Sequence, residues 1–193
     1  MSGMTEVSSL TGRLLVATPA LADPNFERAV VLLLDHDEEG SLGVVLNRPT
    51  PVGVGDILED WADLTGEPGV VFQGGPVSLD SALGVAVVPG GAAGERGPLG
   101  WRRVHGAIGL VDLEAPPELL APALGALRIF AGYAGWGPGQ LEGELSDGAW
   151  YVVESEPGDV SCPVPARLWR AVLRRQRGDL AMVATYPDDP SLN

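Results

Sequence analysis

The sequence contains no lysine, because all 12 of its basic residues are arginine. A P-loop ending in Gly-Lys-Ser/Thr, a pyridoxal phosphate Schiff base and a lysine nucleophile each need the missing amine, so these three kinds of site are excluded. The chain has 26 acidic residues and 12 basic ones, which gives a formal net charge of −14. Nucleic-acid affinity depends largely on basic side chains that displace counterions from phosphates, so this charge disfavours DNA or RNA as a partner.

Cysteine occurs once, at Cys162 between a serine and a proline. A single cysteine excludes an intramolecular disulfide and a C-x-x-C redox pair. Free cysteine usually packs as a small hydrophobic residue, and the sequence identifies no partner for Cys162, so we predict an inert thiol rather than a nucleophile. The amino terminus lacks the regions of a signal peptide, and no apolar run approaches the ~18 residues of a membrane span. We therefore expect a cytoplasmic protein without a membrane partner.

Length and patterning predict one α+β domain over residues 13–186, between flexible ends at 1–12 and 187–193. The chain has 193 residues, 45% of them hydrophobic, which suffices for a core without disulfides or structural metal. The polar segment 35–40 predicts a hairpin loop. Strands and helices mix irregularly, which argues against a doubly wound sheet. Runs rich in Val and Leu, or alternating in polarity, predict strands at 13–17, 29–35, 42–47, 70–73, 83–88, 101–104, 108–113, 127–133 and 150–154.

Helices are predicted where apolar residues recur at helical spacing. Residues 116–127 have that spacing, but Pro122 would break an interior hydrogen bond, which predicts a late start or a kink. The glycine-rich segment 89–100 has little apolar surface and is predicted to be a mobile surface loop. The remaining helices are predicted at 55–64, 139–145 and 166–177.

Known catalytic and binding motifs occur only in part. The glycines at 135–139 follow a strand and precede a helix, but the dinucleotide-binding fingerprint fails at its third glycine, where Gln140 stands. Segment 35–40 begins like an EF-hand loop whose bidentate glutamate would fall on apolar Leu46. Neither histidine has a second ligand at zinc spacing, and no G-x-S-x-G elbow supplies a nucleophile. The sequence therefore predicts neither a metal nor a cofactor.

The segment that follows those glycines has the chemistry of a helix start. A proline in the first turn and acidic residues near the positive end of the helix dipole both favour one. Leu141 and Leu145, four residues apart, are predicted to point into the core. Gln140 and Glu144 share another face, which is either a binding face or a solvated one.

Polar turns at several strand ends are the best candidates for a site. Side chains of Asp and Asn in such turns bond nearby backbone, and arginine adds a bidentate donor. The turns Asp23-Pro24-Asn25, Asn47-Arg48-Pro49 and Gly74-Gly75-Pro76 each follow a predicted strand, and folds often carry their sites where such turns converge. The candidate patch comprises Asp23, Asn25, Arg28, His36, Asn47, Arg48, Gly74, Gly75, Gln140 and Glu142.

Five segments together resemble one known family. They are LLVATPALADPNFERAVVLL, the loop around His36, GVVLNRP, FQGGPV and GYAGWGPGQLEGEL, and their order and spacing closely resemble the AlgH/YqgE family of bacterial proteins. The resemblance implies a compact α+β domain with a mixed, partly barrel-like sheet flanked by helices. It implies no agreed activity, ligand or DNA site, although some members are labelled transcriptional regulators. Matched by motif, it points to Asp23, Pro24, Phe26, Arg28, His36, Asn47, Arg48, Pro49, Gly74, Gly75, Pro76, Tyr133, Trp136, Gly139, Gln140, Leu141 and Glu142.

Three functional hypotheses remain open. The first is a non-enzymatic binding or regulatory module for a protein or a small anionic ligand, in which Arg28 and Arg48 hold the anionic group and His36 and Gln140 form hydrogen bonds. The second is a hydrolase-like enzyme with His36 as general base, oriented by a carboxylate such as Asp23. The third is a DNA-binding regulator, which the net charge disfavours. As a structural alternative, the turns serve backbone geometry alone. The oligomeric state is left open.

Overall fold

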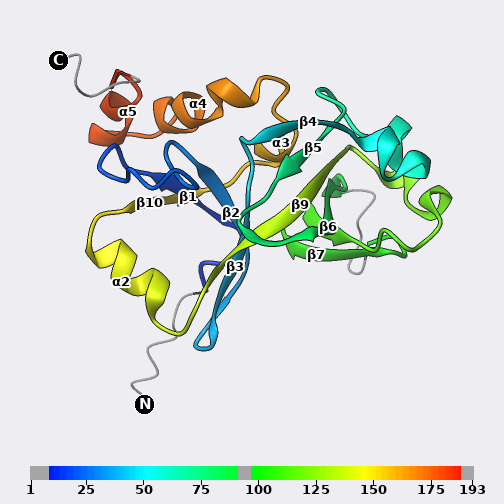
Figure 1. The fold of residues 1–193 in the computed structure, drawn as a ribbon, viewed down its shortest axis with the longest axis horizontal. Coiled ribbons are helices and arrows are strands. Elements are labelled where there is room, and N and C mark those ends of the chain that lie inside the picture. The colour runs from blue at the N-terminus through cyan, green and yellow to red at the C-terminus, as the bar shows by residue number, and fades with distance from the viewer. Residues whose placement is uncertain (1–8, 91–96, 188–193) are drawn as a thin grey trace.

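A computed structural model describes residues 9–90 and 97–187 of the chain. Its strands form a ten-stranded sheet in which β10-β1-β2-β3-β9-β6-β8-β7 are successive neighbours, and β4 and β5 branch from β9. Pairing is antiparallel except between β5 and β9, which run parallel. The sheet curls like half a barrel, with helices packed against it (Figure 1). The predicted α+β class, with a mixed and partly barrel-like sheet, is therefore confirmed.

The strands are close to those predicted from the sequence, with one addition. Strand β4 was not predicted, because its two prolines lower the strand propensity of a short segment. The strands are β1 Arg13–Ala17, β2 Val30–Asp37, β3 Gly40–Val45, β4 Pro49–Gly53, β5 Val70–Gln73, β6 Val77–Val87, β7 Trp101–His105, β8 Ile108–Val111, β9 Ala126–Trp136 and β10 Trp150–Glu154.

The helices are short, and several are single 3₁₀ turns. The helix predicted over 116–127 is wrong: two 3₁₀ turns replace it, and Pro122 lies in the second, where an α-helix would need its missing N–H. The predicted helix at 55–64 is likewise 3₁₀ in form. The helices are α2 Gln140–Ser146, α3 Pro157–Val160, α4 Leu168–Arg174 and α5 Asp179–Val183, with 3₁₀ turns η1 Val54–Asp56, η2 Glu59–Leu64, η3 Pro117–Leu119, η4 Ala121–Ala123 and η5 Pro165–Arg167.

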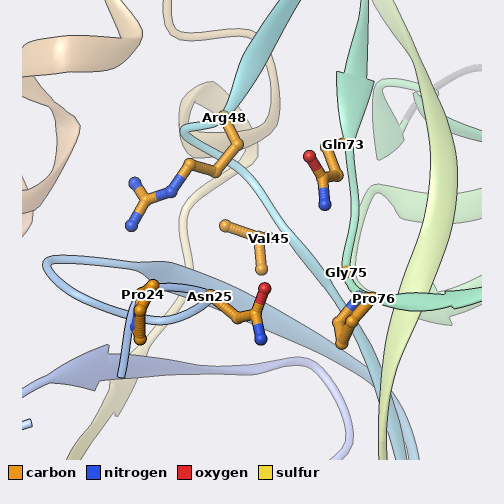
Figure 2. A pocket seen from close by; sticks show the side chains of 7 residues that line it. All are labelled: Pro24, Asn25, Val45, Arg48, Gln73, Gly75 and Pro76. Carbon is orange, nitrogen blue, oxygen red and sulfur yellow. The ribbon is translucent and has the colours of Figure 1, made fainter. Parts of the chain in front are cut away.

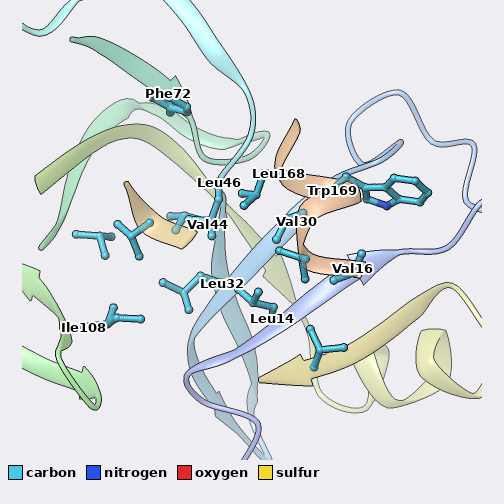
Figure 3. Packing of buried hydrophobic residues seen from close by; sticks show 14 of the residues in the cluster. Leu14, Val16, Val30, Leu32, Val44, Leu46, Phe72, Ile108, Leu168 and Trp169 are labelled. Atoms are coloured by element: carbon cyan, nitrogen blue, oxygen red, sulfur yellow. The ribbon is translucent and has the colours of Figure 1, made fainter. Parts of the chain in front are cut away.

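Both faces of the strands β1, β2 and β3 are buried. On one face, Leu14 and Leu32 pack with Leu168 and Trp169 of α4 (Figure 3). On the other face, Leu141 of α2 packs with alternate residues of the same strands. Helices α2 and α4 lie on opposite sides of this part of the sheet (Figure 1). The continuous Val and Leu runs of the sequence are explained by this burial on two sides.

Two further sequence predictions concern segments that the structure describes in part or not at all. Residues 91–96 of the predicted mobile loop lie outside the described residues, as do residues 1–8 and 188–193 of the two predicted flexible ends. Within 9–90 and 97–187, no helix has the length and apolar character needed to cross a bilayer.

Candidate functional site

Three of the predicted polar turns meet at one hollow, which we call the turn pocket. It has a volume of about 100 Å³, and Val45 of β3 forms its floor. Figure 2 shows the side chains of Asn25, Arg48 and Gln73 arranged around that floor. Its lining residues are Pro24, Asn25, Val45, Arg48, Gln73, Gly75 and Pro76. The structure therefore brings together segments that are 20 or more residues apart in the sequence.

The wall at Gly74 and Gly75 is made of backbone that lies directly against β9. The Gly74 N–H donates to the carbonyl of Ala131 at 2.8 Å, and the Gly74 carbonyl accepts from the N–H of Val45 at 2.8 Å. A Cβ added at Gly75 would overlap the backbone of Tyr133. Only glycine permits this close approach.

The opposite wall is held in place by two predicted site residues. The Asn47 Oδ1 accepts from the N–H of Val30 at 3.0 Å, and its Nδ2 donates to the carbonyl of Arg28 at 2.9 Å. The Asp23 Oδ1 accepts from the N–H of Asn25 at 2.8 Å. Since these polar atoms bind backbone, Asn47 and Asp23 fix the shape of the loop between β1 and β2.

Among the described residues that line the turn pocket, Arg48 is the one with a charged side chain. Its guanidinium donates to the carbonyl of Glu27 and, at 3.5 Å, to that of Asn47. Burial lowers the pKa of Arg48, and the nearby Glu27 carboxylate partly opposes that shift. Within the described part of the chain, Arg48 forms no ion pair with a carboxylate. Arg48 is thus a partly desolvated cation whose hydrogen bonds go to neutral carbonyl groups.

Arg48 also lines a second hollow, which we call the arginine pocket. This pocket has a volume of about 260 Å³ and lies between the turns and the start of α4. The central carbon of the Arg28 guanidinium lies 4.2 Å from the ring centroid of Trp169, in a cation-π contact. The lining residues are Arg28, Asn47, Arg48, Ala166, Trp169 and Arg170. The predicted Arg28 therefore lies next to Arg48 but in a different hollow from Asn25 and Gly75.

The remaining predicted site residues lie elsewhere, so the single patch expected from the sequence is wrong in this part. His36, near the end of β2, shares a hydrogen bond of 2.6 Å between its Nδ1 and the Ser41 Oγ. Its Nε2 lies 3.7 Å from Oε2 of Glu142 in α2. Gln140 accepts from the N–H of Gly137 at 3.0 Å. The contact between His36 and Glu142 joins the β2–β3 hairpin to α2. His36, Gln140 and Glu142 are absent from the described lining of both pockets.

The structure also contradicts the expected pairing of His36 with Asp23. Both imidazole nitrogens face other groups, and Asp23 is bonded within its own turn. Ser41 does lie beside His36, but it lines an open hollow of about 240 Å³ together with three carboxylates, those of Asp35, Asp37 and Glu39. Such a field opposes the negative charge that develops in acyl transfer. The geometry therefore does not support the hydrolase hypothesis.

The glycine-rich segment that leads into α2 has a structural role. Leu141 is fully buried, as predicted. The Glu144 Oε1 accepts from the indole N–H of Trp136 at 3.1 Å and of Trp150 at 2.9 Å. Sequence reasoning placed Glu144 only on a shared face with Gln140, because nothing in the spacing connects it to Trp150. It also missed Gln73 of the turn pocket, although this residue directly precedes Gly74.

Comparison with known proteins identifies the family. Residues 14–181 match the family model described as AlgH-like. The chain is 94% identical to a UPF0301 protein of Streptomyces coelicolor over the full length of both. It is similar to a crystal structure from Corynebacterium diphtheriae, with 34% identity and a TM-score of 0.85 over 91% of this chain and 92% of that one. It also resembles the solution structure of AlgH from Pseudomonas aeruginosa, with 27% identity and a TM-score of 0.66 over 97% and 98%. The chain therefore belongs to the AlgH-like, UPF0301 family.

Proposed function

We propose that this protein is a binding module for a small anionic ligand, and that Arg48 holds the anionic group in the turn pocket. The observation that carries the proposal is the position of Arg48, which is a partly desolvated cation between two hollows. A guanidinium presents donors in a fork that matches carboxylate and phosphate groups. An anion at this position would form an ion pair with Arg48, whose charge the neighbouring carbonyl groups do not neutralise.

The rest of the turn pocket suits the same kind of ligand. Asn25 and Gln73 face the hollow with amide groups that donate hydrogen bonds. A volume of about 100 Å³ admits the anionic group itself or a small ligand around it. The backbone at Gly75 packs directly against Tyr133 of β9, and this close approach fixes one wall of the pocket.

The charge of the whole chain restricts the kind of ligand. A net charge of −14 repels a polyanion along its whole length, whereas a compact anion meets Arg48 directly. This favours a small ligand over DNA, and any regulatory role of this protein then acts through protein contact. We place that activity in the cytoplasm, in line with the sequence expectation.

A thermal-shift series with inorganic phosphate, pyrophosphate, citrate and sulfate tests the proposal. We compare the wild type with Arg48→Ala, Arg48→Lys and, as a matched control, Arg13→Ala, whose side chain is exposed at a distant strand end. A ligand at 100 times its dissociation constant stabilises the native state by about 2.7 kcal/mol. We expect at least one anion to raise the melting temperature of the wild type and of Arg13→Ala, a smaller rise in Arg48→Lys, and none in Arg48→Ala.

Two outcomes would overturn the proposal. One is an Arg48→Ala protein that responds to the anions as the wild type does, which would remove Arg48 from the site. The other is a wild type that responds to none of them up to millimolar concentration at low ionic strength.

A further inference from the structure

Strand β9 carries an arginine in the core, close to the start of the strand. Arg128 is 3% exposed. Its Nη2 donates to the carbonyls of Glu67 and Cys162, both at 3.1 Å. The central carbon of the guanidinium lies 4.1 Å from the ring centroid of Phe72. Two segments that are distant from Arg128 in the sequence, residues 67–72 and the segment around Cys162, therefore enclose this cation.

Arg128 lacks the counterion that a buried cation normally has. Its Nη1 is buried and has no hydrogen-bond partner, and the described residues supply no carboxylate in an ion pair with it. Burial lowers the pKa of Arg128 to about 10, whereas the negative charge of an ionised Cys162 raises that pKa. Buried charges are normally paired, because desolvation costs several kcal/mol per ion. The environment of Arg128 therefore favours an anion beside it.

Cys162 is the group beside this cation that can become an anion. Its own carbonyl already binds the guanidinium, and its side chain packs, partly buried, against the core cluster. The thiol donates to the carbonyl of Val164 over 3.4 Å. A thiol is a weak donor, so the loss of this contact costs little. Cys162 is partly exposed, and its backbone contacts the guanidinium whose Nη1 is unpaired.

We propose that Cys162 is an oxidation site, whose sulfenate or sulfinate form supplies the missing counterion of Arg128. A sulfenate oxygen carries negative charge and accepts hydrogen bonds, which the thiol sulfur does only weakly. The unpaired Nη1 is the donor available to that oxygen. The sequence alone favoured an inert thiol, because Arg128 is 34 residues away from Cys162 in the chain.

The first oxidation step balances with hydrogen peroxide as the oxidant. The Cys162 sulfur attacks one peroxide oxygen, an S–O bond forms and the O–O bond breaks. The sulfur loses two electrons, and the leaving hydroxide takes the thiol proton and becomes water. The sulfenic acid then releases its own proton to solvent, and the sulfenate pairs with Arg128. A second equivalent of peroxide gives the sulfinate in the same way. The chain has no other cysteine to resolve the sulfenate as an internal disulfide.

Oxidation of the full-length protein tests this inference directly. Peroxide is added in steps, and mass spectrometry of the protein gives the number of oxygen atoms gained. Dimedone traps the sulfenate. The Cys162→Ser variant shows that the products form at this residue. Because the anion pairs with a buried cation, we expect oxidation at Cys162 to raise the melting temperature of the wild type by about 2–4 °C. In Arg128→Met, which leaves the anion unpaired, oxidation lowers the melting temperature instead.

The wild type alone is sufficient to overturn the inference if Arg128→Met does not fold. A dimedone adduct at Cys162 that forms no faster than in the urea-unfolded chain would show that the native site does not favour oxidation. A melting temperature that stays constant or falls after oxidation would show that Arg128 does not pair with the product. Neither result depends on Arg48 or on the turn pocket, so this inference and the proposed function fail separately.

Discussion

Asp159 and Arg175 form a bidentate ion pair, in which the Nη1–Oδ1 distance is 2.6 Å and the Nη2–Oδ2 distance is 2.7 Å. Asp159 is 4% exposed and also accepts from the N–H of Glu156 at 2.7 Å. The hydrogen bond with Asp159 is the main cause that raises the pKa of Arg175. The pair connects α3 to the end of α4, the helix whose Trp169 and Arg170 line the arginine pocket.

Removal of one partner of this ion pair should destabilise the fold. Asp159→Asn leaves the guanidinium with only its longer contact to the Glu156 carboxylate, at 3.4 Å, and Arg175→Met leaves the buried Asp159 carboxylate without its cation. Because the carboxylate is buried, we expect each change to lower the free energy of unfolding by about 2–4 kcal/mol. Urea unfolding of both single variants and the double variant gives the coupling energy. A coupling below about 0.5 kcal/mol would mean that the pair contributes no more than a surface contact.

Variants of Asn47 and Asn25 should distinguish a residue that maintains the shape of the pocket wall from a residue that binds the ligand. Asn47→Ala removes the partners of two backbone groups, so we expect a loss of about 2 kcal/mol in the free energy of unfolding. Asn25→Ala, at an exposed position that faces the turn pocket, should change stability by less than about 0.5 kcal/mol and weaken the anion response. Urea unfolding and the thermal-shift series measure the two effects. Equal losses of stability in both variants would contradict this division of roles.

The backbone wall of the turn pocket should not tolerate a side chain. Gly75→Ala places a Cβ against the backbone of Tyr133, and we expect a destabilisation of at least about 2 kcal/mol. Gly143→Ala is the matched control, since its Cβ meets nothing within 4 Å and the residue lies inside α2. This control should stabilise the protein by up to about 1 kcal/mol through helix propensity. Similar unfolding midpoints for the two variants in urea would refute the close approach.

Glu144 should matter more for stability than the other acid in the same helix. Glu144→Ala deprives two buried indole N–H groups of their acceptor, so we expect a loss of about 2–4 kcal/mol. Glu142→Ala removes only a contact with His36 from a half-exposed side chain, and should cost less than about 1 kcal/mol. Unfolding in urea followed by tryptophan fluorescence compares the two. The reverse order of stability would refute the structural role of this segment.

The sequence predicted the strands better than the helices, for a physical reason. Runs such as 29–35 are apolar because both faces of the sheet are buried, so composition alone predicts a strand there. Leucine spacing in 116–127 resembles a helix, but Pro122 and the packing of Leu120 in the core favour 3₁₀ turns. Short helices such as α3 and α5 carry too few residues to show a period, and neither was predicted.

The sequence also predicted only part of the candidate site. Turns after strands indicated polar groups, and three of those turns do converge around Arg48. The sequence does not show at which end of the sheet a turn lies. His36 comes near the end of β2, so it meets Glu142 of α2 instead of the turn pocket. Patterning along the chain gives residue types, whereas the pairing of strands decides which of them meet.

The wall between the two hollows is one guanidinium, because Arg48 lines both. Anions that arrived from either side would share the charge of Arg48, although Arg28 and Arg170 also line the arginine pocket, and each anion would repel the other across that thin partition. Occupancy of one hollow would therefore weaken binding in its neighbour.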